Sequence, residues 1–289
     1  MRAPMPCYDA QGFCAVTTAA SPAQDQDGAR VPVHELIQLL HIEFTEEALL
    51  SGTAFTLRRV HESESLVLAG DVFHSLYVVR SGCFKSVYTD ISGREQVLGF
   101  PMSGDLMGAE GIDCDHYSST AVSLGTSEVV TIPFAGLVRM AEACPKLQAM
   151  LHCVLSRQLL RVQNIVGILR TLGAEGRVAA FLLSLSARLG GLGYSPWSFN
   201  LPMTRQDIGG YLGLTVQTVR CALSALHRLG IIQVRSRHID IVYAGGLRRV
   251  IFPNKRSAAG AAIQPDSPVA RIRNRHNTLG RELIAGVRL

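Results

Sequence analysis

The residues with the clearest chemistry lie between positions 203 and 231, where hydroxyl, carboxyl and guanidinium side chains recur at short spacings. Thr204 with Asp207 three residues later is typical of a helix N-terminus, and Gly213 suits the left-handed conformation that ends a helix. Thr215 predicts the start of a second helix. Two capped helices joined by a short turn predict a helix-turn-helix, whose second helix fits the major groove of DNA.

The second predicted helix separates apolar from polar side chains. Val219, Leu223 and Leu226 form one face, which leaves the opposite face free to contact base edges. Glutamine pairs naturally with adenine, arginine pairs with guanine, and valine contacts the methyl group of thymine. The candidate base readers are Val216, Gln217, Arg220 and Cys221.

A wing is predicted after this helix. Apolar runs at 231–234 and 239–243 flank Ser236 and Arg237, as in a two-stranded ribbon. Hydroxyl and guanidinium groups at the helix starts and on the wing suit phosphate contacts. A helical hairpin used only for packing is the alternative, which the wing and the local positive charge disfavour. The candidate phosphate ligands are Thr204, Arg205, Thr215, Thr218, Arg235 and Arg237.

Charge is distributed unevenly along the 289 residues, although the net charge is only +5. Residues 1–173 hold 12 Lys and Arg against 18 Asp and Glu, residues 174–252 hold 9 against 3, and residues 253–289 hold 7 against 2. Ordinary scatter of charges is one explanation. A basic carboxyl-terminal half also favours a polyanionic partner, most simply double-stranded DNA.

The other segments predict the elements that carry this motif. Residues 1–32 lack periodicity and predict a flexible arm, and helices are expected at 33–40 and 46–50. Within 33–143, glycines at 70, 82, 93 and 104 separate short apolar runs, which predicts a small β-barrel or sandwich. Residues 174–252 form the winged unit, and the basic segment 253–289 predicts a disordered tail.

Residues 144–173 predict one long helix with an apolar stripe. The stripe steps by four and three residues, which is the heptad spacing of a two-helix seam. A helix packed on its own domain would also carry such a stripe. Its persistence over several turns favours a seam between two subunits, and therefore a homodimer. The candidate interface residues are Leu155, Leu159, Val162, Val166 and Leu169.

Several classes of protein are disfavoured. The seven cysteines are scattered without a Cys-x-x-Cys spacing, so neither a disulfide framework nor a zinc site is predicted. Apolar runs are too short to span a membrane and no signal-like segment opens the chain, so we expect a cytoplasmic protein. No nucleophile–base spacing, phosphate loop or metal-ligand cluster is present. We therefore expect no enzyme and assign neither catalytic residues nor metal ligands.

Motifs in order along residues 36–245 resemble the Crp/Fnr superfamily of bacterial transcription regulators, most closely its Fnr branch. Besides the helix-turn-helix, they are the segments 76–86, 99–107, 131–134 and 174–181. The resemblance implies an α+β fold with a jelly-roll sensor domain of the cyclic-nucleotide-binding type, a dimerisation helix and a carboxyl-terminal winged helix-turn-helix. It also implies a homodimer that binds a palindromic promoter site and contacts RNA polymerase.

The sensor segment departs from the relatives that bind cyclic AMP. Those relatives carry an acidic residue and an Arg-Ser/Thr pair after a Gly-Asp-Leu turn, whereas residues 108–120 contain no arginine here. A buried phosphate without a cationic partner is poorly compensated. Cyclic AMP is therefore not expected.

The cluster ligands of the Fnr branch are also absent. In Fnr-type sensors, which this chain resembles, four cysteines hold an iron–sulfur cluster. The aligned positions here hold His41 and Val130, with the other two near Pro32 and Glu35. We expect no cofactor, although a cluster held by the remaining cysteines stays an alternative.

The signal is expected to be oxygen, redox state or a metabolite. Cys83, Cys144 and Cys153 are expected to be buried apolar residues, whereas Cys114 lies in a predicted loop and is the candidate redox thiol. The alternative function is a ligand- or haem-binding signalling module without specific DNA binding. Its haem candidates are His41, His74 and His116.

The reading helix departs from the family in one further respect. Fnr-type helices carry Glu-x-x-Ser-Arg, whereas this chain has Gln217 followed by Arg220 and Cys221. The arginine is displaced by one position, which is about 100° around the helix. The half-site of the family therefore does not carry over to this chain.

Overall fold

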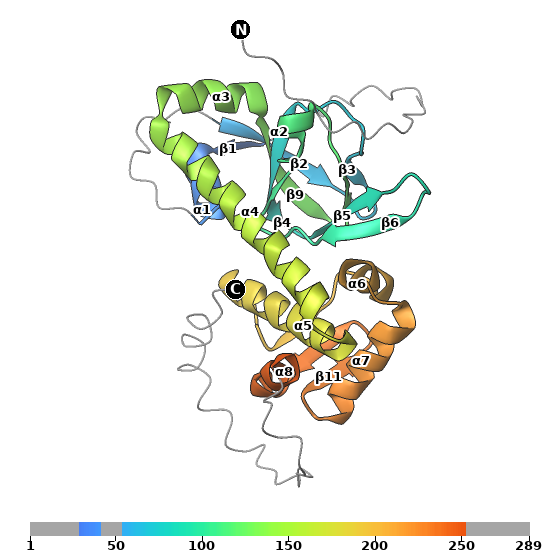
Figure 1. The fold of residues 1–289 in the computed structure, drawn as a ribbon. Helices are drawn as coiled ribbons and strands as arrows, with labels where there is room; N and C mark the ends of the chain where they lie inside the picture. Colours follow the sequence, from blue (N-terminus) through green and yellow to red (C-terminus); the bar gives the residue numbers. More distant parts are fainter. Residues whose placement is uncertain (1–28, 42–53, 253–289) are drawn as a thin grey trace. The chain divides into compact units, whose positions relative to one another are not determined.

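The structure is a computed structural model that describes residues 29–41 and 54–252. The chain divides into two compact units, Met1–Met150 and Leu151–Leu289 (Figure 1). The helix expected at 46–50 and the basic tail at 253–289 lie outside the described residues. No helix within the described ranges is both long and apolar enough to cross a membrane.

The first unit is built on two antiparallel sheets, which confirms the predicted jelly-roll type of fold. One sheet has the strand order β1-β2-β9-β4-β7 and the other has the order β3-β8-β5-β6. The strands are β1 Arg30–Pro32, β2 Ala54–Val60, β3 Ser65–Val67, β4 Ser75–Ser81, β5 Phe84–Thr89, β6 Glu95–Gly99, β7 Leu106–Met107, β8 Thr120–Ser123 and β9 Ser127–Pro133.

Strand β1 corrects the predicted extent of the amino-terminal arm. The sequence places residues 30–32 in the arm, but they pair with β2, and Val31 is buried. The reason is a long-range pairing that three residues do not reveal by periodicity.

Turns and core residues hold the two sheets together. Gly82 has a φ of 91°, and a Cβ atom at this position would lie 2.8 Å from the Cα of Ser127, so only glycine fits there. Tyr77, Phe84 and Tyr117 are buried in the core of this unit, and the Tyr117 hydroxyl donates to the Ser75 carbonyl at 2.7 Å.

Three short helices and one long helix accompany the sheets. They are α1 Val33–Leu39, α2 Gly111–Cys114, α3 Phe134–Ala143 and α4 Pro145–Thr171. Helix α4 occupies the segment predicted to form the long dimerisation helix, and it continues into the second unit.

The second unit is a winged helix-turn-helix. Its elements are α5 Ala174–Gly191, β10 Ser198–Asn200, α6 Arg205–Leu212, α7 Val216–Arg228, β11 Ile232–Arg235, β12 His238–Ile241 and α8 Ala244–Ile251. Leu182, Met203, Ile208, Leu226 and Ile239 are fully buried and form its core. Strand β10 and helix α8 were not predicted, and β10 extends the two-stranded wing to a three-stranded sheet.

The predicted burial of the cysteines holds for two of the three. Cys83 and Cys144 are buried, but Cys153 is exposed in the single chain. Cys153 lies on α4 next to the buried Val154, and successive side chains on a helix point about 100° apart. Val154 therefore faces inward while Cys153 faces outward, and the prediction for Cys153 was wrong.

Candidate nucleic-acid interface

Side-chain hydrogen bonds fix the start of each helix, and a left-handed glycine ends the first one. The Thr204 hydroxyl accepts from the Asp207 amide at 3.1 Å, and the Asp207 carboxylate accepts from the Thr204 amide at 2.9 Å. Gly213 ends α6 with φ 62° and ψ 40°. The Thr215 hydroxyl accepts from the Thr218 amide at 3.1 Å and so caps α7. The predicted caps are confirmed, because satisfied backbone donors start each helix where the sequence places it.

The turn between the two helices packs tightly on α6. A Cβ atom on Gly209 would lie 2.6 Å from the carbonyl oxygen of Leu214. The Leu214 amide donates to the Gly209 carbonyl at 2.9 Å. Glycine at this position lets the turn approach closely enough to set the angle between α6 and α7.

Helix α7 exposes the predicted reading face. Val219, Leu223 and Leu226 are buried, so the opposite side of the helix faces solvent. Gln217 and Cys221 lie one turn apart on that side, with the Gln217 amide 3.6 Å from the Cys221 sulfur. Of the four candidate base readers, Val216 is half-buried and the exposed ones are Gln217, Arg220 and Cys221.

Arg205 of α6 contacts the wing turn and feels the charges of arginines on α7 and on the wing. Arg205, in the first turn of α6, donates to the Ser236 carbonyl in the wing turn at 2.7 Å. Burial lowers the pKa of Arg205, and the positive charges of Arg237 and Arg220 lower it further. The charges of one arginine on α7 and one in the wing turn thus both act unfavourably on Arg205 of α6. A polyanion at this surface would relieve that repulsion.

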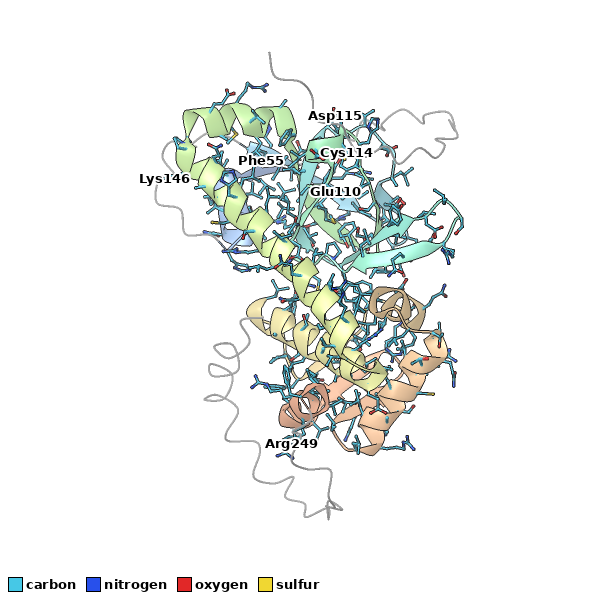
Figure 2. All side chains as sticks on the ribbon, viewed as in Figure 1. Phe55, Glu110, Cys114, Asp115, Lys146 and Arg249 are labelled. Atoms are coloured by element: carbon cyan, nitrogen blue, oxygen red, sulfur yellow. The ribbon has the colours of Figure 1, made fainter. Side chains whose placement is uncertain are left out.

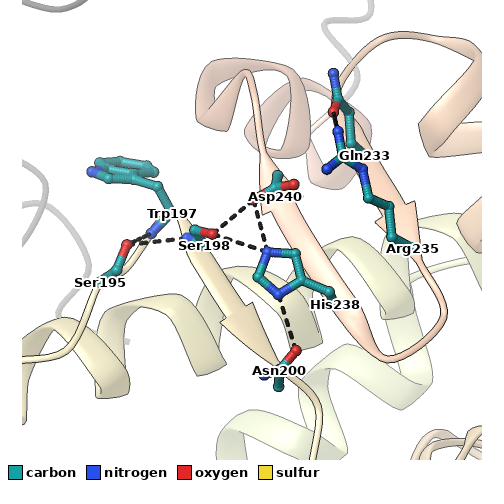
Figure 3. Close-up of polar contacts among 8 residues, drawn as sticks. All are labelled: Ser195, Trp197, Ser198, Asn200, Gln233, Arg235, His238 and Asp240. Carbon is teal, nitrogen blue, oxygen red and sulfur yellow. Dashed lines mark hydrogen bonds and ion pairs between the residues drawn. The ribbon is translucent and has the colours of Figure 1, made fainter.

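The outer face of the three-stranded sheet carries a network of polar side chains (Figure 3). The Ser198 hydroxyl donates to the Asp240 carboxylate at 2.7 Å, and the His238 ring nitrogens lie 3.1 Å from Asp240 and 2.9 Å from the Asn200 amide oxygen. The hydrogen bond from Ser198 lowers the pKa of Asp240, and that from His238 adds to the effect. The Ser198 hydroxyl also lies 3.0 Å from the His238 Nε2 atom, so side chains as well as backbone pairing tie β10 to β12.

The candidate phosphate ligands are spread over the same unit. Four are exposed, and Arg205 and Thr218 are half-buried. The sequence did not predict the contact between Arg205 and Ser236, because 31 residues separate the two. The four exposed candidates are Thr204, Thr215, Arg235 and Arg237.

Within the part of the chain that the structure describes, the middle of the apolar stripe of α4 is exposed. Leu159, Val162 and Val166 are 59%, 57% and 43% exposed. Leu155 and Leu169 are half-buried. Packing on its own domain, the alternative explanation of the stripe, therefore does not account for the three central residues.

Comparisons with known proteins match both units. Residues 57–144 match the cyclic nucleotide-binding domain, and residues 176–250 match the Crp-like helix-turn-helix domain. Electron transport regulator A of Shewanella oneidensis is 38% identical over 183 residues, which cover 63% of this chain and 73% of that protein. The anaerobic regulatory protein of Haemophilus influenzae is 38% identical over 196 residues, covering 68% and 76%. The structure of FixK2 from Bradyrhizobium japonicum is similar, with a TM-score of 0.64, 27% identity and coverage of 73% of this chain and 100% of that one.

These similarities agree with the fold of both units. The relatives are transcription regulators, which confirms the prediction that the chain is not an enzyme. Both matched domains fall in the predicted order, sensor first and helix-turn-helix second. The chain is therefore a DNA-binding transcription regulator that belongs to the Crp/Fnr family.

Proposed function

We propose that the protein acts as a homodimer that binds a palindromic DNA site through α7 and the wing. The observation that carries the proposal is the positive charge around Arg205, which bonds to the wing turn at Ser236 and feels the charges of Arg220 on α7 and Arg237 in the wing. Phosphates on either side of a major groove would neutralise this charge. The alternative function, a signalling module without DNA binding, does not explain why positive charge gathers beside α7.

The exposed stripe on α4 supports the homodimer. A second copy supplies an identical stripe with the same heptad spacing, so that two α4 helices bury each other's apolar side chains. A two-fold axis through this seam relates two copies of α7, and such a pair reads inverted half-sites. At a promoter, the resemblance to the family also supports a contact with RNA polymerase.

Arg237 gives the first test of this interface. Arg237→Ala is expected to weaken binding to all DNA sequences alike, because an exposed wing arginine contacts phosphate and not bases. The slope of log affinity against log salt should become shallower by about 0.9 if the side chain neutralises one phosphate. Titrations of labelled DNA at several salt concentrations measure both quantities.

Arg139→Ala supplies the control, because Arg139 is an exposed arginine on α3 in the other unit. It should leave affinity and slope unchanged. An Arg237→Ala protein with the unaltered slope would show that the wing turn does not touch the phosphate backbone.

For the signal, we propose oxygen, redox state or a related metabolite. The support is the similarity to an electron transport regulator and to an anaerobic regulatory protein. These names concern the relatives, and the similarity covers 73% and 76% of their lengths.

We also propose that this chain senses without an iron–sulfur cluster. Of the positions aligned with cluster cysteines, Val130 is fully buried in the core. The Glu35 carboxylate lies 2.8 Å from the Arg80 guanidinium, which also lies 3.5 Å from Glu128. An apolar side chain and an ion-paired carboxylate do not supply the thiolates that a cluster needs.

Cyclic AMP is disfavoured by contacts at the corresponding turn. The Ser119 hydroxyl donates to the Glu110 carboxylate at 2.9 Å, and the Ser86 hydroxyl donates to Ser119 at 3.0 Å. These acidic and hydroxyl groups bind one another, and no arginine lies within 108–120 to hold a phosphate. We propose that this turn does not bind the nucleotide.

Cys114 stays the candidate redox thiol. It is the exposed last residue of α2, where Figure 2 shows it beside Asp115, and its sulfur lies 3.9 Å from the Asp113 carboxylate. Oxidant is expected to weaken DNA binding by the unaltered protein but not by Cys114→Ser. Cys153→Ser, which removes another exposed thiol, should behave like the unaltered protein.

The unaltered protein, purified without air, tests the cofactor proposals through its absorption spectrum and iron content. We expect it to be colourless and free of iron while still binding DNA. Absorption bands of haem would favour the alternative in which a histidine binds haem. In the structure the ring of His74, one of the haem candidates, lies 3.1 Å from the Val72 carbonyl and 3.4 Å from the Tyr77 hydroxyl. Bands of a cluster, or an oxidant response that survives in Cys114→Ser, would contradict the proposed sensing chemistry.

A further inference from the structure

Arg177 joins the ends of two helices through three hydrogen bonds. It lies near the start of α5, and its Nε donates to the Leu172 carbonyl at 2.9 Å while Nη2 donates to the Leu169 carbonyl at 2.7 Å. Its Nη1 donates to the Leu212 carbonyl at 3.0 Å. Leu169 lies in the last turn of α4, Leu172 directly follows that helix, and Leu212 is the last residue of α6. One side chain therefore connects the long helix with the first helix of the helix-turn-helix.

The physical chemistry of helix ends explains why arginine suits this place. The last carbonyl groups of a helix lack partners within the helix and carry the negative end of its dipole. A guanidinium group is permanently charged and presents donors in a fixed plane, so it bonds to several carbonyls at once. Lysine has the charge but lacks the planar fork.

The connection around Arg177 is short and closely packed. Only Leu172 and Gly173 separate α4 from α5. A Cβ atom on Gly176 would lie 3.3 Å from the Leu172 Cβ, so α5 begins close against the end of α4. The joint leaves little space for the two helices to shift independently.

A second contact holds α6 in the same place. Tyr211 packs edge-on against Phe181 of α5, with the ring centroids 6.0 Å apart. Burial raises the pKa of Tyr211, while the charges of Arg188 on α5 and Arg161 on α4 act in the opposite direction. Helices α5 and α6 thus contact each other at Tyr211 as well as at Arg177.

We propose that Arg177 is a positioning residue that fixes the winged helix-turn-helix on the dimerisation helix and so sets the spacing of the two reading helices. The inference rests on the proposed homodimer. A rigid joint presents both copies of α7 in register with one palindrome. A loose joint keeps each reading helix intact but loses the gain from binding two half-sites together.

The experiment measures the affinity of the full-length protein for three DNA sites. The sites are a single half-site, the palindrome selected by the unaltered protein, and that palindrome with one base pair inserted at its centre. Arg177→Gln should bind the half-site within about twofold of the unaltered protein but the palindrome about 10- to 100-fold more weakly. Its preference for the palindrome over the lengthened site should also fall.

Two further variants sharpen the comparison. Arg177→Lys should behave like Arg177→Gln, because charge without the planar fork does not connect three carbonyls. Arg170→Ala removes an exposed cation in the last turn of α4 and should match the unaltered protein. Binding to the half-site also reports folding, since a winged helix that failed to fold would lose it.

Three results would overturn the inference. They are an equal loss of affinity for half-site and palindrome, an unaltered spacing preference in Arg177→Gln, and full recovery in Arg177→Lys. Failure of the proposed function has a different signature, in which the unaltered protein itself shows no preference for the palindrome over the half-site.

Discussion

A Val162→Glu chain is expected to be monomeric and to bind its palindrome at least about 100-fold more weakly than the unaltered protein. Val162 lies in the middle of the exposed α4 stripe, between Leu159 and Val166. In the proposed dimer the new carboxylate would face its own copy in an apolar seam. Two like charges without partners in such a place are strongly unfavourable. Analytical ultracentrifugation and DNA titration measure the two effects.

Gln163→Glu is the matched control. It places a new carboxylate one residue further along the same helix, at an exposed position outside the stripe. This variant should remain a dimer with unaltered affinity. Val162→Glu should keep its far-ultraviolet circular dichroism and its weak binding to a half-site, because the folded units do not depend on the seam. A Val162→Glu protein that sediments as an unaltered dimer would place the interface elsewhere.

Arg220→Ala is expected to relax the preference at one base pair in each half-site. Arg220 is exposed on the reading face, and a guanidinium fork contacts the O6 and N7 atoms of guanine. Removing a good bidentate pair reduces discrimination by about 1–3 kcal/mol. Competition with sites that carry each single-base substitution measures the preference at every position.

The competing explanation is that Arg220, displaced by one position relative to the family pattern, contacts a phosphate. In that case Arg220→Ala would lower the affinity for all sites equally and keep every base preference. Arg228→Ala serves as control, because Arg228 is an exposed arginine at the far end of α7. It should leave the preference at each base pair unchanged.

Local signals explain why so much of the site could be predicted from the sequence. Thr204, Thr215 and Gly213 act on neighbouring backbone groups, so their residue types alone mark the helix ends. The period of apolar residues likewise predicted the buried face of α7, which begins at Val219. Such signals need no knowledge of distant segments.

Contacts between distant segments could not be predicted in this way. The hydrogen bonds from Arg177 to Leu212 and from Arg205 to Ser236 span 35 and 31 residues. Strand β10 has only three residues, and its partner β12 begins at His238, so no period identifies it. Helix α8 contains Gly245 and Gly246, which have low helix propensity, and packing on α5 overrides that preference.

The central claim is that the chain reads a two-fold symmetric site as a dimer, and selection of binding sites from random DNA by the unaltered protein tests it most directly. We expect the recovered sequences to contain two inverted copies of one half-site at a fixed separation of about one helical turn, ~10 base pairs between centres. The same separation should recur in independent selections. Recovery of a single unrepeated half-site, of half-sites at variable separations, or of no common sequence would contradict it.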